Sequence, residues 1–220
     1  MKIVGALPWY DEQPSWLDRC VRSLAGVVDE LVAIDGRWDL YDDAAPILSH
    51  FEQEIAISKA AHAVGIESEV WKPARVWPSQ VAKRAELMRI CSEKGDWIFV
   101  IDADEYVAKL DVEGWIEFMS VDTVFDVAMV GLHALYEQMP DRRVRRLYRS
   151  GTEVRTAHNG YWREGQWLHG DTAKVTLAPA LDLSDVLVLH DDSGRREPER
   201  EQKAMDYRRA RARERAEVWP

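Results

Sequence analysis

The sequence is poor in cysteine and has no cluster of cysteine and histidine that would bind zinc. Its two cysteines, Cys20 and Cys91, lie in apolar patterns of helical spacing, and no CxxC pair occurs. Reduced core cysteines are typical of cytoplasmic proteins, whereas small secreted domains use paired cysteines as disulfides. We therefore expect a cytoplasmic chain without disulfides or structural zinc.

Long apolar runs, internal repeats and long Gly/Ser linkers are also absent. No stretch of about 18 apolar residues occurs, so no membrane span is predicted. The first residues, MKIVGALPWYDEQ, carry one lysine and a short apolar stretch that soon turns acidic, which favours a first strand over a signal peptide. The 220 residues suffice for one large domain, or for a domain with an extension.

Basic residues are outnumbered, with 29 Lys/Arg against 39 Asp/Glu and a net charge of −10. This balance argues against nucleic-acid binding over the whole surface. It reverses from Arg195 to the end, where 9 Lys/Arg stand against 6 Asp/Glu, and a polar helix is expected there. A solvated face, a helix closing over a diphosphate and a docking surface for an acidic acceptor, such as DNA or anionic lipid, all stay open.

Strand-like and helix-like patterns alternate through the first half of the chain. Strands are expected at 2–9, 30–35, 67–77 and 97–101, and the intervening helices at 15–28, 46–64 and 79–95. This alternation predicts an α/β fold, with a mainly parallel sheet flanked by helices. Sheets of this class bind ligands at the carboxyl ends of their strands.

Acidic residues follow two of these strands. Asp35 ends the second strand, and the apolar run WIFVI ends in Asp102, Asp104 and Glu105. If the strand continues, Asp102 and Asp104 share a face and Glu105 points the other way. Two neighbouring carboxylates repel each other, and a bound Mg²⁺ or Mn²⁺ would remove that repulsion. Solvated acids after the end of a strand are the alternative for so short a motif.

Basic residues and a histidine complete this candidate site. Lys83 and Arg84 lie in the first turns of the helix before the acidic strand, where the helix N-terminus also favours anions. His190 ends the apolar run VLVL and can complete a metal shell, although a lone histidine is more often structural. Arg195 can pair with a diphosphate as a planar fork.

The second half of the chain has a different pattern. A short helix near 111–120 precedes strand-like runs at 123–136, 144–149 and 185–191. The aromatic stretch 158–167, HNGYWREGQW, either walls a sugar pocket or packs in the core. We expect residues 1–107, which end in the acidic motif, to form one half of a domain, 108–194 the other half of the same domain, and 195–220 a C-terminal polar helix.

The order of these segments resembles glycosyltransferase family 2, whose members have the GT-A fold, especially its small bacterial and phage-type members. The resemblance is carried by SWLDRCVRSLAGVVDELVAIDG, the Lys/Arg-bearing helix and GDWIFVIDADEY. RRLYRS at 145–150 is similar to an Arg-Leu-Phe-Arg stretch of such enzymes, and VLVLHDDSGRREPEREQKAMDYR to their late histidine and helix. It covers residues 2–107 well and 142–210 loosely. It implies a GT-A-like, Rossmann-type sheet with a smaller mixed α+β half.

The resemblance also implies a nucleotide-diphosphate sugar as donor, with a UDP-sugar expected. Carried over by position, Asp35 would contact the nucleoside, and Lys83 or Arg84 the nucleotide. Asp102 would lie near the ribose and the metal, while Asp104 would bind the metal directly. The metal, Mn²⁺ or Mg²⁺, would neutralise the leaving diphosphate.

His190 would close the metal shell, and a carboxylate base would deprotonate the acceptor hydroxyl, because family 2 enzymes invert the anomeric centre. The candidates for this base are Glu164 and Asp171, with His158 or His169 beside them. If none is suitable, a retaining mechanism is open. The loop after the second strand, DGRWD, also departs from the Asp-x-Gly-Ser-Thr-Asp of the family.

The sequence thus predicts a metal-dependent glycosyltransferase whose acceptor is a saccharide, a lipid-linked group, a protein or modified DNA. A binding module of the same fold that lacks chemistry is the main alternative. A phosphatase with DxD at a strand end is disfavoured, because Glu105 follows the second Asp and the strand is the fourth. A nucleotidyltransferase would need a Gly-rich loop, which ALPWYDEQ is not.

Overall fold

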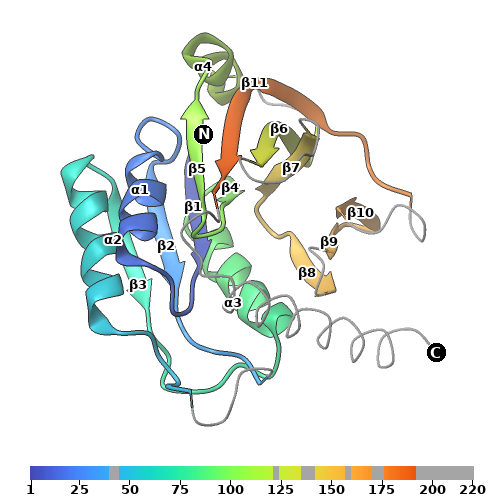
Figure 1. Cartoon of the computed structure of the whole chain (residues 1–220). Helices are drawn as coiled ribbons and strands as arrows, with labels where there is room; N and C mark the ends of the chain where they lie inside the picture. Colours follow the sequence, from blue (N-terminus) through green and yellow to red (C-terminus); the bar gives the residue numbers. More distant parts are fainter. Residues whose placement is uncertain (40–44, 121–123, 135–141, 157–159, 170–175, 192–220) are drawn as a thin grey trace.

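The computed structural model describes residues 1–220 except 40–44, 121–123, 135–141, 157–159, 170–175 and 192–220. An eight-stranded sheet forms the centre, with the strand order β3-β2-β1-β4-β7-β6-β11-β5 (Figure 1), and a separate three-stranded sheet has the order β10-β9-β8. The helices are α1 (Pro14–Arg22), α2 (Phe51–Ala63), α3 (Gln80–Ser92) and α4 (Val112–Ser120). The strands of the first half are β1 (Ile3–Pro8), β2 (Glu30–Ile34), β3 (Glu67–Trp71), β4 (Trp97–Val100) and β5 (Glu105–Lys109). Those of the second half are β6 (Val127–Ala134), β7 (Arg142–Arg149), β8 (Glu153–Thr156), β9 (Gly160–Arg163), β10 (Gln166–His169) and β11 (Leu181–His190).

The large sheet is mainly parallel, which confirms the predicted α/β fold class. Strands β3, β2, β1 and β4 run parallel, and β6 pairs with β11 in parallel. The antiparallel members are β7, between β4 and β6, and β5 at the edge beside β11. Because β1, β2 and β4 are flanked by strands and covered on both faces, their residues read as continuous apolar runs.

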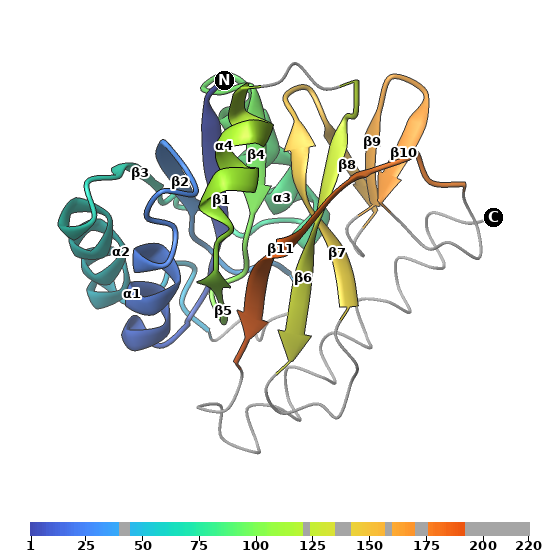
Figure 2. The same ribbon diagram turned by 90° about the horizontal axis from the view of Figure 1, so that it is seen from above.

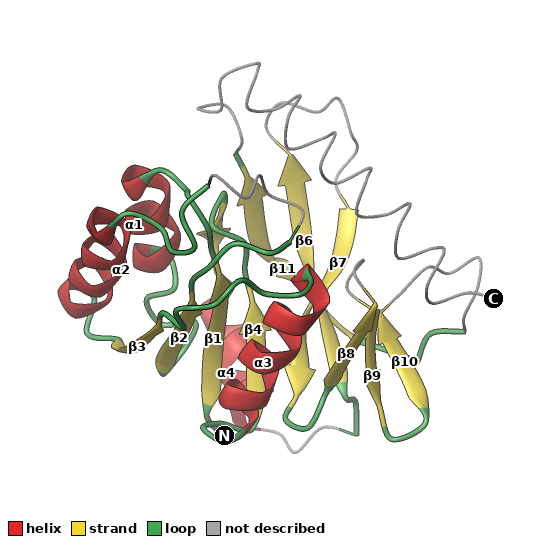
Figure 3. Cartoon of the chain, turned by 90° about the horizontal axis from the view of Figure 1, so that it is seen from below, coloured by secondary structure: helices red, strands yellow, loops and turns green. Residues whose placement is uncertain are grey.

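Two apolar clusters cover the two faces of the sheet. Figures 2 and 3 show the ribbon, with its helices and sheet, from opposite sides. Helices α1, α2 and α4 pack on one face through residues such as Leu17, Ile57 and Phe118. Helix α3 covers the other face with Met88 and its neighbours, and the small sheet joins it there. The sequence therefore builds a three-layer domain whose first strands are buried on both sides.

The sheet curls so that its last edge approaches the first helix. The backbone N–H of Val107 on β5 donates to Ser23 Oγ at 2.9 Å, just after α1. The guanidinium of Arg19 on α1 lies 4.3 Å from the ring centre of Tyr106 on β5. The ends of β4 and β11 are thereby placed at one edge, where ligands bind in sheets of this class.

Several elements differ from the sequence-based expectations. Strand β3 ends at Trp71 rather than at residue 77, and α2 begins at Phe51 rather than near Pro46. Strand β5 and the small sheet of β8, β9 and β10 were not predicted. Among the described residues, no helix has the length and apolar character needed to cross a lipid bilayer. The expected division into halves at residue 107 stays a prediction.

Stability should depend strongly on β4 and little on the exposed face of α4. We predict that Ile98→Ala, at a side chain with 0% exposure, lowers the free energy of unfolding by about 2–5 kcal/mol because it leaves a cavity. The matched Ile116→Ala, at a side chain with 61% exposure, should change it by less than about 0.5 kcal/mol. Urea denaturation measures both, and equal losses would contradict the described core.

Candidate functional site

The acidic residues after β4 lie in a tight turn, not in a continued strand. Strand β4 ends at Val100, and the N–H of Glu105 donates to the carbonyl of Asp102 at 3.0 Å. We call residues 102–105 the acid turn. The expectation that Asp102 and Asp104 share a strand face was therefore wrong, because the strand alternation ends before them. Glu105 was expected to point away, yet its carboxylate accepts the Asp102 N–H at 3.0 Å.

Two arginines from different elements pair with the acid turn. Arg84 on α3 places Nη2 2.5 Å from Asp102 Oδ1. Arg146 on β7 donates to the carboxylate of Glu105 and lies 3.8 Å from Asp102 Oδ2. Both guanidiniums are almost fully buried, and so is the Glu105 carboxylate. The ion pairs tie the end of β4 to both α3 and β7.

Burial and charge act against each other in this cluster. Burial raises the pKa of Glu105 to about 7, and Arg146 opposes that rise. Burial would lower the pKa of Arg84, but Asp102 outweighs this effect and the pKa is raised. The same holds for Arg146, whose pKa is raised chiefly by Glu105 against the cost of burial. Both guanidiniums therefore stay charged beside the acids.

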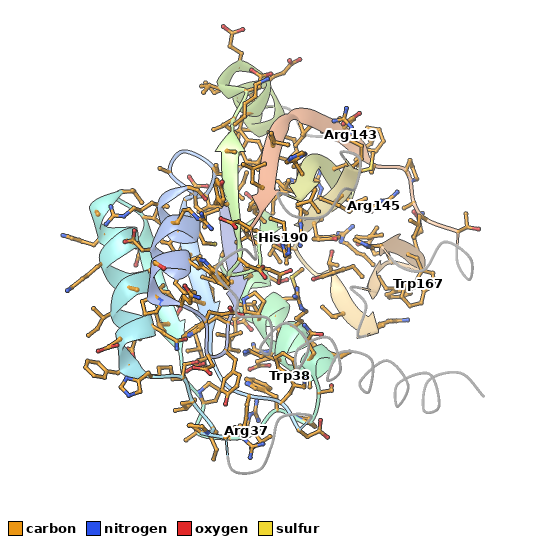
Figure 4. All side chains as sticks on the ribbon, viewed as in Figure 1. Arg37, Trp38, Arg143, Arg145, Trp167 and His190 are labelled. Carbon is orange, nitrogen blue, oxygen red and sulfur yellow. The ribbon has the colours of Figure 1, made fainter. Side chains whose placement is uncertain are left out.

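The structure brings His190 to the acid turn, as the sequence predicted. His190 Nδ1, at the end of β11, lies 3.6 Å from Asp104 Oδ1 and 3.8 Å from Glu105 Oε1. The N–H of Asp191 donates to the carbonyl of Asp104 at 2.8 Å and fixes this approach. Figure 4 shows His190 at the centre of the molecule, beside the end of the sheet.

A divalent cation would find two adjacent ligands here rather than a complete cage. Within the described ranges, no group of three or more His, Cys, Asp or Glu side chains is placed to hold a metal ion. Asp104 and His190 offer one oxygen and one nitrogen, whereas Asp102 is already paired with Arg84. Mg²⁺ and Mn²⁺ are commonly held by one or two protein ligands plus substrate phosphates, so the pair fits such an ion.

The loop after β2 is organised around Asp35. Its carboxylate has 0% exposure, accepts the N–H and hydroxyl of Ser49 at 2.9 and 2.6 Å, and accepts the N–H of Gly36 at 2.6 Å. Gly36 has a φ of +111°, and a Cβ there would lie 2.9 Å from Trp77 Nε1. The indole of Trp77 donates to the Asp35 carbonyl at 3.0 Å. Asp35 thus shapes the loop, and its expected contact with a nucleoside stays a prediction.

Lys83 is buried between two loops at the same edge of the sheet. Its side chain donates to the carbonyls of Trp9 and Gly36 at 2.5 and 2.8 Å, and the residue has 1% exposure. Burial lowers its pKa to about 7, against the influence of Asp35. Trp38, labelled in Figure 4, has its ring centre 5.8 Å from the amine. The expected contact of Lys83 with a phosphate would require these loops to open.

The remaining predicted residues are not all placed beside the acid turn. Glu164 lies on the exposed hairpin turn between β9 and β10, with a φ of +48° and Arg163 2.8 Å away. Arg163 also pairs with Asp126 at 2.6 Å, just before β6 begins, so this turn lies toward the opposite edge of the sheet. The proposed base Glu164 is therefore not brought to the acid turn. Asp171, His158 and Arg195 lie outside the described residues.

An aromatic cluster joins the small sheet to β7. Tyr148 and Tyr161 stack with ring centres 4.2 Å apart, and Tyr148 Oη lies 3.0 Å from His169 Nδ1. Both tyrosines are buried, so part of the aromatic stretch packs in the core rather than lining a pocket. Trp167, half-buried on β10, is labelled in Figure 4.

Sequence reasoning missed Arg146 as a partner of the acids. RRLYRS resembled a stretch of known enzymes, but the resemblance assigned it no role. Only the strand order, which places β7 directly beside β4, brings Arg146 and Glu105 together. Ser49, which caps Asp35, was missed for the same reason, because no local pattern marks a contact across a long loop.

No family model and no curated protein sequence matches the chain. Among solved structures, TarS from S. aureus is similar at 15% identity and a TM-score of 0.46, over 64% of this chain and 23% of TarS. A TarS fragment in complex with UDP has a TM-score of 0.44 at 15% identity, over 64% of this chain and 38% of its own. A putative glucose-1-phosphate thymidylyltransferase from Bacillus anthracis has a TM-score of 0.39 at 10% identity, over 59% and 55%. The chain thus spans well under two thirds of each, and these partial likenesses do not identify a family.

The burial of His169 should appear in the pH dependence of stability. Burial lowers the pKa of His169 from 6.5 to about 4, with Arg146 and Arg145 adding to the effect. The unfolded chain therefore takes up this proton first, and stability present above pH 6.5 is lost as the pH falls toward 4. We predict that the free energy of unfolding of His169→Gln falls less on acidification than that of wild type, by up to about 3 kcal/mol. Unfolding free energies of both proteins at pH 7 and 4.5 measure it, and parallel losses would contradict the burial.

Proposed function

We propose that the chain is a nucleotide-sugar-dependent glycosyltransferase whose donor site is the acid turn. The observation that carries this proposal is the pairing of Asp104 with His190. Asp104 in the turn after β4 and His190 at the end of β11 are far apart in the sequence, yet they lie 3.6 Å apart at the carboxyl ends of the strands, where such sheets bind ligands. Packing of the core alone does not require a carboxylate and an imidazole side by side at this edge.

The neighbouring residues support a bound diphosphate. Asp104 and His190 would hold Mn²⁺ or Mg²⁺, which as a Lewis acid would stabilise the leaving diphosphate. Arg84 and Arg146 hold Asp102 and Glu105 in place and neutralise them. Asp104, in the same turn, lies next to the imidazole of His190. The donor proposed first is a UDP-sugar, and inversion at the anomeric carbon stays a prediction because the base is not identified.

A binding module of the same fold is the second candidate. One observation favours it, namely that the structure does not bring the expected base Glu164 to the acid turn. Such a module would bind a nucleotide sugar without transferring or hydrolysing it. Binding and turnover therefore have to be measured separately.

The role of Asp104 can be tested by calorimetry with UDP. Wild type should bind UDP in the presence of Mn²⁺. Asp104→Asn should weaken this binding at least about tenfold, because it removes the charged carboxylate ligand of the metal while keeping the shape of the side chain. The control is Asp182→Asn, an exposed carboxylate on β11 that pairs with Arg143. It should leave UDP binding unchanged, and thermal unfolding should show that both variants are folded.

Release of UDP from a panel of UDP-sugars then distinguishes the candidates. Metal-dependent release by wild type that is lost in Asp104→Asn supports the transferase. Metal-dependent binding without any release supports the binding module. If wild type binds no nucleotide with or without Mn²⁺, both candidates fail.

A further inference from the structure

Strand β7 contains a bulge at two consecutive arginines. Arg145 lies opposite Met129 and Leu147 opposite Ala128 on β6, so Arg146 is the additional residue. A bulge interrupts the alternation of side chains and often re-aims a residue beside an active site. Here both guanidiniums act on the same half-buried imidazole, because Arg146 and Arg145 each add to the effect of burial in lowering the pKa of His169.

The two arginines differ in their partners. Arg146 pairs with Glu105 and Asp102, whereas Arg145 donates to the carbonyl of Leu168 on β10. No carboxylate among the described residues contacts Arg145. Burial lowers its pKa, and the opposing contribution comes from the Tyr148 phenol rather than from a carboxylate. Arg84 and Arg146 each have fully buried guanidinium N–H groups without a hydrogen-bond partner. The N–H groups of Arg145 are not among these buried, unpartnered groups.

A half-buried guanidinium without a counter-ion is costly unless an anion binds it. Partial burial removes water from the charge, and a single backbone carbonyl replaces little of that hydration. The planar fork of arginine matches the two oxygens of a carboxylate or phosphate. In a chain with a net charge of −10, an arginine that contacts no carboxylate of the described residues is a candidate site for an added anion.

The position of Arg145 relates it to the proposed transfer. It precedes Arg146, whose guanidinium holds the acid turn. Arg143, two residues earlier, is exposed and makes only a long contact of 3.4 Å with exposed Asp182. Figure 4 shows Arg143 and Arg145 on the same side of His190, with Arg145 between Arg143 and Trp167 of β10. The positive charge thus lies over the second half of the chain, on the strand that also supplies Arg146 to the acid turn.

We propose that the acceptor carries an oxyanion, a phosphate or carboxylate, and that Arg145 binds this group. The inference rests on the proposed transferase function and names the chemical class of its acceptor. The donor diphosphate is assigned to Asp104 and His190, so Arg145 is available to a second substrate. Arg143 adds positive charge at the approach to this subsite.

Calorimetric titration with three related sugars tests the proposal. Glucose, glucose 6-phosphate and glucuronate are titrated into full-length protein saturated with UDP and Mg²⁺, so that the donor site is filled. At least one anionic sugar should bind about tenfold or more tightly than glucose, and the tighter of the two identifies the oxyanion. Arg145→Gln should abolish this preference, and Arg145→Lys should restore part of it because the charge returns.

The matched control is Arg155→Gln on β8, an exposed arginine that pairs with Glu153 and stacks on Trp162. It should leave the preference unchanged. The proposal is overturned if glucose binds as tightly as both anionic sugars, if Arg145→Gln keeps the preference, or if UDP displaces the anionic sugar. Titration of UDP alone tests the proposed function separately. If UDP does not bind, the same three sugars on UDP-free protein still decide the role of Arg145.

Discussion

The pairing of buried acids with arginines at the end of β4 is the constraint on which the site depends. Glu105 has 3% exposure, and a carboxylate at such depth is costly unless it is paired. Arg146 on β7 pairs with Glu105 and Arg84 on α3 pairs with Asp102, so two elements that pack around the turn supply the positive charge. The position of the site is therefore fixed by charge as well as by the packing of apolar layers.

The same edge of the sheet uses other polar groups to hold its loops. Asp35 and Lys83 would both be expected to face a nucleotide, yet each satisfies backbone groups of the protein itself. A buried carbonyl that loses its donor costs about 1–3 kcal/mol, so these side chains have structural value without a ligand. A nucleotide would have to replace these bonds or use the surfaces that they organise, such as the ring of half-buried Trp38.

The sequence predicts most of the first half and less of the second, for physical reasons. Strands β1, β2 and β4 carry apolar runs, and α3 is capped by Ser79, whose hydroxyl accepts the N–H of Ala82. These are local signals. Strand β5 and the small sheet are held by pairings and contacts that no short pattern encodes. The alternation argument failed at Asp102 because a turn, formed by the hydrogen bond from Glu105 to Asp102, replaced the strand. His190 was found because a histidine at the end of an apolar run is a local signal, whereas the partnership of Arg146 with Glu105 is not.

If the acid turn binds a cation and a diphosphate, as proposed, the charges there couple the binding of the two. Asp102, Asp104 and Glu105 together contribute three negative charges when ionised, and Arg84 and Arg146 contribute two positive ones. A divalent ion bound to Asp104 and an uncharged His190 would leave an excess of positive charge in a poorly hydrated place. A diphosphate alone would meet an excess of negative charge there. Each ligand therefore removes the electrostatic cost of the other, and by linkage each must raise the affinity of the other by the same factor. The arginines that pair with Asp102 and Glu105 would thus also set the charge of the turn so that the two proposed ligands bind best together.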